Sequence, residues 1–248
     1  MRDLLRVAHR VLLQLWRDPR YLVMSSVVPV LLVLLMKALF DDVRAFKMLN
    51  IPIAAYALPA AAFFIFFLTY IVCTIVLIRE RREGTLSRMF ASGYSRSSVI
   101  LGYVSGYGLL AVCQTLVVIL ATAWVFDLSL AGRVLPVVLT TLLMALVSLS
   151  LGVFISTLAR TEGQIFPTIP LVIIPSLLLC GLIIPLDDLH VSLQTLAYVV
   201  PLTYAQKVLL GVMRDGQSFA DVAGWFVALA GYGTALLIIA SLTVRESE

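Results

Sequence analysis

The stretch Arg79-Glu-Arg-Arg-Glu-Gly-Thr-Leu-Ser-Arg-Met-Phe-Ala-Ser-Gly-Tyr-Ser-Arg96 is a charged island between two long apolar runs. It holds five arginines and two glutamates. Burying these charges at the centre of a bilayer would cost on the order of 20 kcal/mol. The island must therefore lie in water while both of its neighbours lie in lipid. This predicts a transmembrane helix that leaves the membrane, a short excursion, and a second helix that enters it again.

The island has helical order of its own. Three apolar side chains at helical spacing form one small facet: Leu86, Met89 and Phe90. Gly84 can break the preceding helix, Thr85 can cap a new one, and Gly93 can end it. The pattern predicts a short amphipathic helix on the membrane surface, with an apolar facet and a basic rim that suit a groove in another protein. On composition alone, a solvated loop that follows the positive-inside rule is the alternative.

Composition places the whole chain in a membrane. Of 248 residues, 61% are hydrophobic and only 13% are charged, against about 25% charged in soluble domains. The net charge of +4 does not indicate nucleic-acid binding, because the arginines sit at the edges of apolar runs. Cys73, Cys113 and Cys180 each lie inside such a run, and an odd number of them gives no disulfide framework. We expect them to serve helix packing.

Six apolar runs are long enough to cross a hydrocarbon core that needs about 20 residues per helix. They cover residues 21–40, 53–78, 99–126, 134–158, 165–186 and 222–244. Twelve Lys and Arg residues fall on the side of the island and six on the other side. Both termini are therefore expected in the cytoplasm. The sequence predicts one all-α integral membrane domain over residues 1–248.

Three segments outside or between regular spans have their own patterns. As a helix, residues 1–19 would have apolar side chains on one face and arginines on another, which is typical of a helix that lies in the membrane interface. Residues 187–221 contain apolar pieces too short to span, which predicts re-entrant or interfacial helices on the external side. The run 165–186 carries four prolines and a glycine, which predicts a distorted helix of the kind that can line a pathway.

The residues that are missing restrict the mechanism. No charged residue lies deep in a predicted span, and Lys37 is near an outer end, which disfavours ion-coupled transport. Neither Lys37, Lys47 nor Lys207 follows a glycine as a phosphate-binding loop requires, so the chain is not expected to bind ATP or to be an enzyme by itself. His9 and His190 lie on opposite sides of the membrane, which argues against a metal site or a catalytic triad. Such a bundle could transport a compound only if another protein drives it.

Three motifs resemble a known family. Residues 80–86, Glu-Arg-Arg-Glu-Gly-Thr-Leu, resemble the Glu-x-x-x-Gly-Thr-Leu signature that follows the second span in membrane subunits of type-2 ATP-binding-cassette exporters. These include bacterial permeases of the daunorubicin-resistance type. A second match runs from Leu-Gly-Val-Phe-Ile-Ser-Thr-Leu-Ala at 151–159 through Pro175 and Gly181 to Pro185. The third is Pro-Leu-Thr-Tyr-Ala at 201–205, so that the resemblance covers essentially the whole chain.

The resemblance implies a fold and a set of partners. The fold has an N-terminal interfacial connecting helix, six spans, a coupling helix in residues 79–97, and short re-entrant external helices before the sixth span. The coupling helix docks in a cleft of a separate ATPase subunit, which binds ATP and Mg²⁺ and is present in two copies. A second permease chain, identical or related, completes the pathway in the bacterial cytoplasmic membrane. No cofactor is expected on this chain.

The resemblance also assigns candidate site residues. The ATPase-coupling surface would consist of Glu83, Gly84, Thr85, Leu86, Arg88, Met89 and Phe90. The second and fifth spans would face the dimer axis with Phe63, Phe67 and Tyr70 opposite Ile174, Leu178 and Leu182. For the aromatic stripe of Phe63, Phe67 and Tyr70, helix packing is the favoured interpretation, and a wall of the pathway is the other one. An uncharged aromatic wall would suit a hydrophobic or amphiphilic substrate. Gly102, Ser105 and Gly106 are assigned to close helix contact.

The leading hypothesis is thus an exporter permease for a drug, antibiotic or lipid-like compound. A scaffold or sensor that signals through the same island, without transport, is the alternative from another class. Polysaccharide, sodium or peptide export remains open within the transporter hypothesis. An intramembrane enzyme of lipid metabolism ranks last, because the paired acids or histidines of such chemistry are missing.

Overall fold

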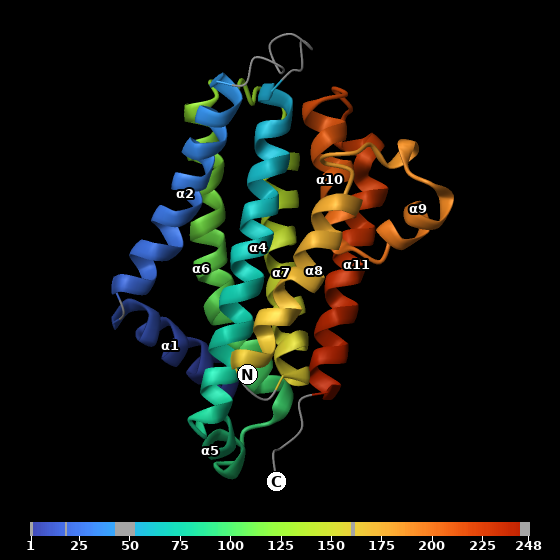
Figure 1. The fold of residues 1–248 in the computed structure, drawn as a ribbon. Coiled ribbons are helices and arrows are strands. Elements are labelled where there is room, and N and C mark those ends of the chain that lie inside the picture. Colours follow the sequence, from blue (N-terminus) through green and yellow to red (C-terminus); the bar gives the residue numbers. More distant parts are fainter. Residues whose placement is uncertain (1, 18, 43–52, 160–161, 244–248) are drawn as a thin grey trace.

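The computed structural model describes the chain over residues 2–17, 19–42, 53–159 and 162–243. Within these ranges every regular element is a helix (Figure 1). The helices in chain order are α1 (Arg2–Arg17), α2 (Pro19–Asp42), α4 (Ile53–Arg82), α5 (Thr85–Ala91), α6 (Arg96–Val125), α7 (Val134–Leu158), η1 (Glu162–Gln164), α8 (Ile165–Leu179), η2 (Leu186–Asp188), α9 (Val191–Ala197), α10 (Pro201–Met213) and α11 (Phe219–Thr243). The predicted all-α class is therefore confirmed for the described part of the chain. Arg44, Lys47, Arg160 and Arg245, which contribute to the predicted orientation, lie outside it.

Four of the described helices are long and apolar enough to cross a membrane, namely α4, α6, α7 and α11. They coincide with four predicted spans, those at 53–78, 99–126, 134–158 and 222–244. Helix α4 continues beyond its predicted end and includes the first charged residues of the island. The first predicted span, 21–40, falls within α2, which has 24 residues.

The fifth predicted span is only partly helical. Helix α8 has 15 residues, so that it is about 22 Å long, less than the roughly 30 Å of a hydrocarbon core. It ends at Leu179, shortly before Gly181, which takes a left-handed φ of 84°. The helix therefore covers the first part of the predicted span 165–186, and the count of six spans stays a prediction.

The segment predicted to contain re-entrant helices forms a sharply bent pair. Helices α9 and α10 meet at an angle of 96°, and α9 projects sideways from the bundle (Figure 1). Pro201 occupies the first turn of α10, where its missing N–H costs no hydrogen bond. The Thr203 hydroxyl donates to the carbonyl of Ala197 at 2.6 Å and closes the bend. Gln206 ties α10 to α4 by donating to the carbonyl of Pro59 at 2.8 Å.

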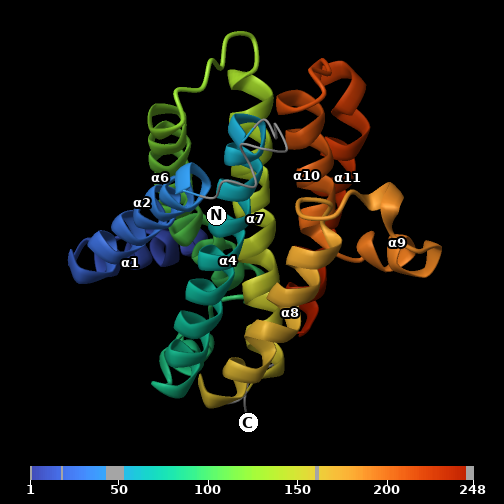
Figure 2. The ribbon, with the colours of Figure 1, turned by 45° about the horizontal axis from the view of Figure 1, so that its top comes forward.

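Helices α4 and α7 run side by side through the middle of the bundle (Figures 1 and 2). A Cβ atom at Gly152 of α7 would lie 3.0 Å from the Cβ of Cys73 and from the carbonyl oxygen of Tyr70, so that any larger residue would push the two helices apart by a few tenths of an ångström. The Ser148 hydroxyl donates across the same contact to the carbonyl of Phe66. Small residues and hydroxyls are the usual means of association between helices in lipid, where hydrophobic burial gives no driving force.

Helix α1 lies against α6 through two glycines. A Cβ atom at Gly102 would be 2.5 Å from the Cβ of Val7, and one at Gly106 would be 2.6 Å from Val11. The predicted role of these glycines in close packing agrees with this contact. Ser105, assigned to the same role, is exposed instead. The opposite side of α1 leaves Trp16 79% exposed, as expected for a helix in the membrane interface.

We expect Gly106→Val to displace α1 from α6, because three further carbon atoms cannot enter this contact. Overpacking of this kind costs about 1–3 kcal/mol, which thermal unfolding of the purified protein in detergent would report as a lower midpoint. Ser105→Val adds a side chain of the same shape at an exposed neighbouring position and serves as the control. Equal midpoints for the two variants would contradict the α1–α6 contact.

Candidate functional site

The charged island lies at one end of the bundle, where the chain leaves α4 through a turn, forms the short helix α5 and returns through a second turn to α6 (Figure 1). Gly84 adopts a left-handed φ of 69° and precedes the seven residues of α5, and Gly93 turns the chain again with a φ of 84°. The predicted breaks at both glycines are confirmed. Thr85 does not cap the helix as predicted. It is the first residue of α5, and its hydroxyl accepts a hydrogen bond from Arg88 at 3.2 Å.

The apolar facet of α5 is turned towards the rest of the chain. Leu86 is only 6% exposed and belongs to a hydrophobic cluster with residues of α1, α4 and α6. Met89 and Phe90 are half-buried against the same cluster. The facet expected to insert into a partner protein therefore packs on its own bundle, since α1 and α6 lie within reach and remove it from water.

The face of α5 that remains accessible is polar. Glu83, Ser87 and Arg88 are exposed, while Gly84 and Thr85 are half-buried. Of the predicted coupling residues, Glu83 and Arg88 are thus the ones that present charges to the surroundings. A protein that binds this end of the bundle would meet these charges first and the apolar residues only after a rearrangement.

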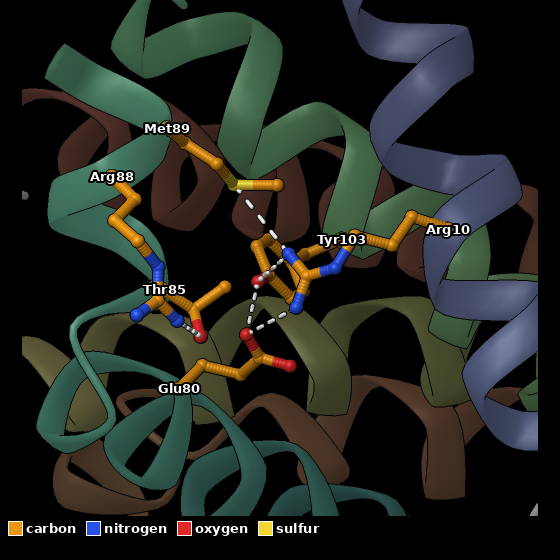
Figure 3. A network of polar contacts seen from close by, with 6 residues as sticks. All are labelled: Arg10, Glu80, Thr85, Arg88, Met89 and Tyr103. Atoms are coloured by element: carbon orange, nitrogen blue, oxygen red, sulfur yellow. Dashed lines mark hydrogen bonds and ion pairs between the residues drawn. The ribbon is translucent and has the colours of Figure 1, made fainter. Parts of the chain in front are cut away.

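A buried carboxylate lies directly beneath α5 (Figure 3). Glu80, in the last turn of α4, is only 2% exposed. Arg10 of α1 donates to its Oε2 atom at 2.7 Å, and the hydroxyl of Tyr103 in α6 donates to the same oxygen at 3.0 Å. Arg10 also approaches the Met89 sulfur of α5 at 3.7 Å. One carboxylate thereby joins α1, α4 and α6, and its arginine touches α5.

The partners of Arg10 keep its guanidinium charged. Burial by itself lowers the pKa of Arg10, but the hydrogen bonds and charges of Glu80 and Tyr103 outweigh burial, so that the pKa is raised overall. A buried ion pair of this kind is stable only when hydrogen bonds satisfy the remaining polar atoms. Tyr103 supplies one of these bonds. The charge of Arg10 is therefore a fixed part of the structure.

Sequence reasoning did not select Arg10, Glu80 or Tyr103 as site residues. Arg10 belongs to the arginine face of a helix that the sequence predicts to lie in the membrane interface, and Tyr103 lies in an apolar run. Of these three residues, only Glu80 could have been selected from the sequence, because it is the first residue of the Glu-x-x-x-Gly-Thr-Leu motif. It precedes Gly84 by one helical turn, within α4, where an acid near the end of a span needs a partner.

A cavity of about 430 Å³ separates α1 from α5 beside this network. Its wall includes Arg6, Arg10 and Arg88, together with the side chains of Thr85 and Ser92. The cavity is open towards the surroundings on the same face as the exposed charges of α5. The end of the bundle that carries α5 therefore presents a basic, indented surface.

The predicted pathway residues divide into two groups. Phe63 and Tyr70 are buried in a hydrophobic cluster formed by α4, α7, α8, α10 and α11, which agrees with the packing alternative. Phe67 is half-buried and stacks on Phe63, with ring centroids 6.4 Å apart. Ile174 and Leu178 are exposed on α8.

Leu182, the remaining predicted pathway residue, lies beyond the end of α8 and packs against the same cluster as Phe63. The structure thus brings Phe63, Tyr70 and Leu182 together inside the bundle. It leaves Ile174 and Leu178 on an outer face of the bundle.

Known proteins with similar sequences are transporters. The chain is 27% identical to ABC transporter G family member 20 of Dictyostelium discoideum over 179 residues, which are 71% of this chain and 24% of the relative. It is 26% identical to the probable multidrug ABC transporter permease YbhR of Escherichia coli over 134 residues, 54% of this chain and 36% of the relative. It is also 26% identical to the linearmycin resistance permease protein LnrN of Bacillus subtilis over 167 residues, 66% of this chain and 43% of the relative.

The chain thus matches less than half the length of each of these relatives. The family model described as ABC-2 type transporter matches residues 2–213, which include α1, the island, the buried network and the bent helix pair. The predicted family resemblance is confirmed by this match: the chain belongs to the ABC-2 type transporter family of membrane permeases.

Proposed function

We propose that this chain is the permease subunit of an ATP-driven exporter for a hydrophobic or amphiphilic compound, such as a drug, an antibiotic or a lipid-like molecule. Two permease chains, identical or related, form the pathway in the bacterial cytoplasmic membrane, with both termini in the cytoplasm. Two copies of a separate ATPase subunit bind ATP and Mg²⁺ and supply the energy. Family membership implies an ATPase partner, which supports this arrangement.

The observation that carries the proposal is the buried Glu80 network beside α5. When an ATPase subunit pushes on the exposed face of α5, the force passes to α4 through the short turn at Gly84 and to α1 and α6 through the packed Leu86. Because Glu80 binds Arg10 and Tyr103, the ends of these three helices move together. Closure of an ATPase dimer would then change the arrangement of the spans.

The substrate class follows from the charge distribution of the spans. The sequence has no Asp, Glu, Lys, Arg or His within residues 53–78, 99–126, 134–158 or 165–186. A pathway made from these helices offers no charged group to replace the hydration of an ion or of a strongly polar solute. An apolar molecule has no favourable contacts with water to give up, so that it can enter such a pathway. The names of YbhR and LnrN, which refer to multidrug transport and to linearmycin resistance, are consistent with a compound of this kind.

We expect Arg10→Met to destabilise the protein more than the double variant Arg10→Met/Glu80→Gln. The single change leaves a buried carboxylate without its cation, and we expect it to lower the free energy of unfolding by about 3 kcal/mol. This value lies near the low end of the range for breaking a buried ion pair, because the Arg10 side chain is partly exposed. The double change removes the charge as well and recovers part of the loss. Chemical unfolding in detergent, analysed as a double-mutant cycle, would measure this coupling. Strictly additive effects would contradict a structural role of the pair.

We expect charge reversal on the accessible surface at α5, either Glu83→Lys in the turn before α5 or Arg88→Glu in α5 itself, to uncouple ATP hydrolysis from export. Because both side chains are exposed, the midpoint of thermal unfolding should stay within a few degrees of the wild-type value. Efflux at equal expression should fall at least about tenfold, which corresponds to the loss of an interfacial charge contact of about 1.4 kcal/mol or more. Leu86→Asp is unsuitable for this test, since it places a charge in the core. Asp187→Lys, exposed in the predicted external segment, is the control. Unchanged efflux in both α5 variants would remove the coupling role of this face.

The proposal as a whole is tested by the composition of the native complex. We expect the tagged chain, purified from its own membranes in mild detergent, to show by native mass two permease chains and two ATP-binding-cassette ATPase subunits. A permease without any ATPase, under conditions that preserve other membrane complexes, would refute the exporter and favour a scaffold or sensor.

A further inference from the structure

A second cavity lies within the apolar part of the bundle, away from α5. It has a volume of about 280 Å³ and lies between α2, α4 and α6, with α7 behind it. Its outer wall consists of half-buried apolar side chains, among them Val28, Leu68 and Leu110. The cavity lies across α4 from the cluster that holds Phe63 and Tyr70, so that it is separate from the predicted pathway residues.

Two polar side chains in this apolar wall have unused hydrogen-bonding capacity. Thr69 is 6% exposed, and its hydroxyl has no hydrogen-bond partner among the residues that the structure describes. Gln114 is 7% exposed and lines the cavity, and its side-chain amide makes no hydrogen bond to another residue that the structure describes. A threonine in a membrane helix usually satisfies its hydroxyl by donating to the carbonyl four residues earlier, as Thr122 does to Val118.

Unpaired polar groups at this depth are costly. An amide or hydroxyl removed from water without a hydrogen bond loses a large part of its solvation, and the hydrocarbon core holds no water to replace it. An amide side chain both donates and accepts, and a hydroxyl does the same, so that either can bind an alcohol or a carbonyl. A molecule with one such group and an apolar body would satisfy the polar side chains and fill the apolar wall.

We propose that this cavity binds a small neutral amphiphile from the bilayer, with a single hydroxyl or carbonyl head. The head hydrogen-bonds to the Gln114 amide and the Thr69 hydroxyl, and the apolar body contacts Leu68, Val72 and Leu110. A charged head is disfavoured because none of the described residues that line the cavity carries a charge to neutralise it. At about 30 Å³ for a group the size of a water molecule, the cavity of about 280 Å³ holds roughly nine groups, so that the head and about eight carbon atoms lie inside it and the rest of a longer chain extends through its open side.

A photoreactive 1-decanol analogue, with a diazirine in the chain and a terminal alkyne, is the probe that fits this description. The full-length protein in phosphatidylcholine nanodiscs is irradiated with the probe, and the labelled residues are located by mass spectrometry. We expect labelling within residues 68–73 and 107–114, reduced by excess unlabelled 1-decanol and much less by decane. The assay needs no ATPase, so its result is independent of the proposed export.

Four variants make the assignment specific. Thr69→Val and Gln114→Leu keep the size of the side chain and remove its polar atoms, and each should lower labelling of the two segments roughly three- to tenfold, the factor for one hydrogen bond. Ala111→Phe should abolish labelling by filling the cavity, in which Ala111 is a buried wall residue. The control is Thr140→Val, because Thr140 is also buried with an unpaired hydroxyl but does not line the cavity.

The outcome decides whether the cavity binds the polar head of an amphiphile specifically or is labelled without any contribution from its polar side chains. Loss of labelling in Thr69→Val and Gln114→Leu but not in Thr140→Val supports the proposed site, provided that the variants elute as monodisperse protein. Equal labelling of the wild type, Thr69→Val and Gln114→Leu would overturn it, as would equal labelling by a decane analogue without the hydroxyl. These two polar variants keep the test decisive even if Ala111→Phe does not fold.

Discussion

The ion pair between Arg10 and Glu80 fixes the end of the bundle that carries α5. A carboxylate that is 2% exposed at the end of an apolar helix needs a cation and a hydrogen-bond donor close by, because buried polar oxygens without partners are costly. Arg10 from α1 and Tyr103 from α6 meet both needs (Figure 3). Helix α1 is thereby held against α4 and α6 by charge as well as by packing, and the position of α5 follows from it.

Away from this end, the helices depend on close contact between small residues. Glycines bring α1 to α6 at residues 102 and 106 and bring α7 to α4 at residue 152. Within lipid, such contacts and the occasional hydroxyl bond replace the hydrophobic effect that assembles soluble helices. Helix α4 consequently has two different sides. One faces α1, α2 and α6, and the other faces α8, α10 and α11.

In the proposed exporter, this division would let one helix take part in two tasks. The side of α4 near its charged end is joined to α1 and α6 through Glu80, and under the proposal it would pass on a movement of α5. The opposite side carries Phe63 and Tyr70 in a packed aromatic and aliphatic cluster, where they support α7 and α8. Direct contact of these two rings with a substrate would require the helices packed around them to move, whereas Ile174 and Leu178 are exposed on the outer face of α8.

The sequence alone determined the membrane class, the four long helices and the helix breaks at Gly84 and Gly93, because hydropathy, charge and glycine act locally along the chain. Only the tertiary structure decided which neighbour each side chain meets. Spacing showed that Leu86 is part of an apolar facet, but α1 and α6, distant in sequence, bury it. In the same way, the pairing of Arg10 with Glu80 depends on two residues 70 positions apart, which no local pattern relates.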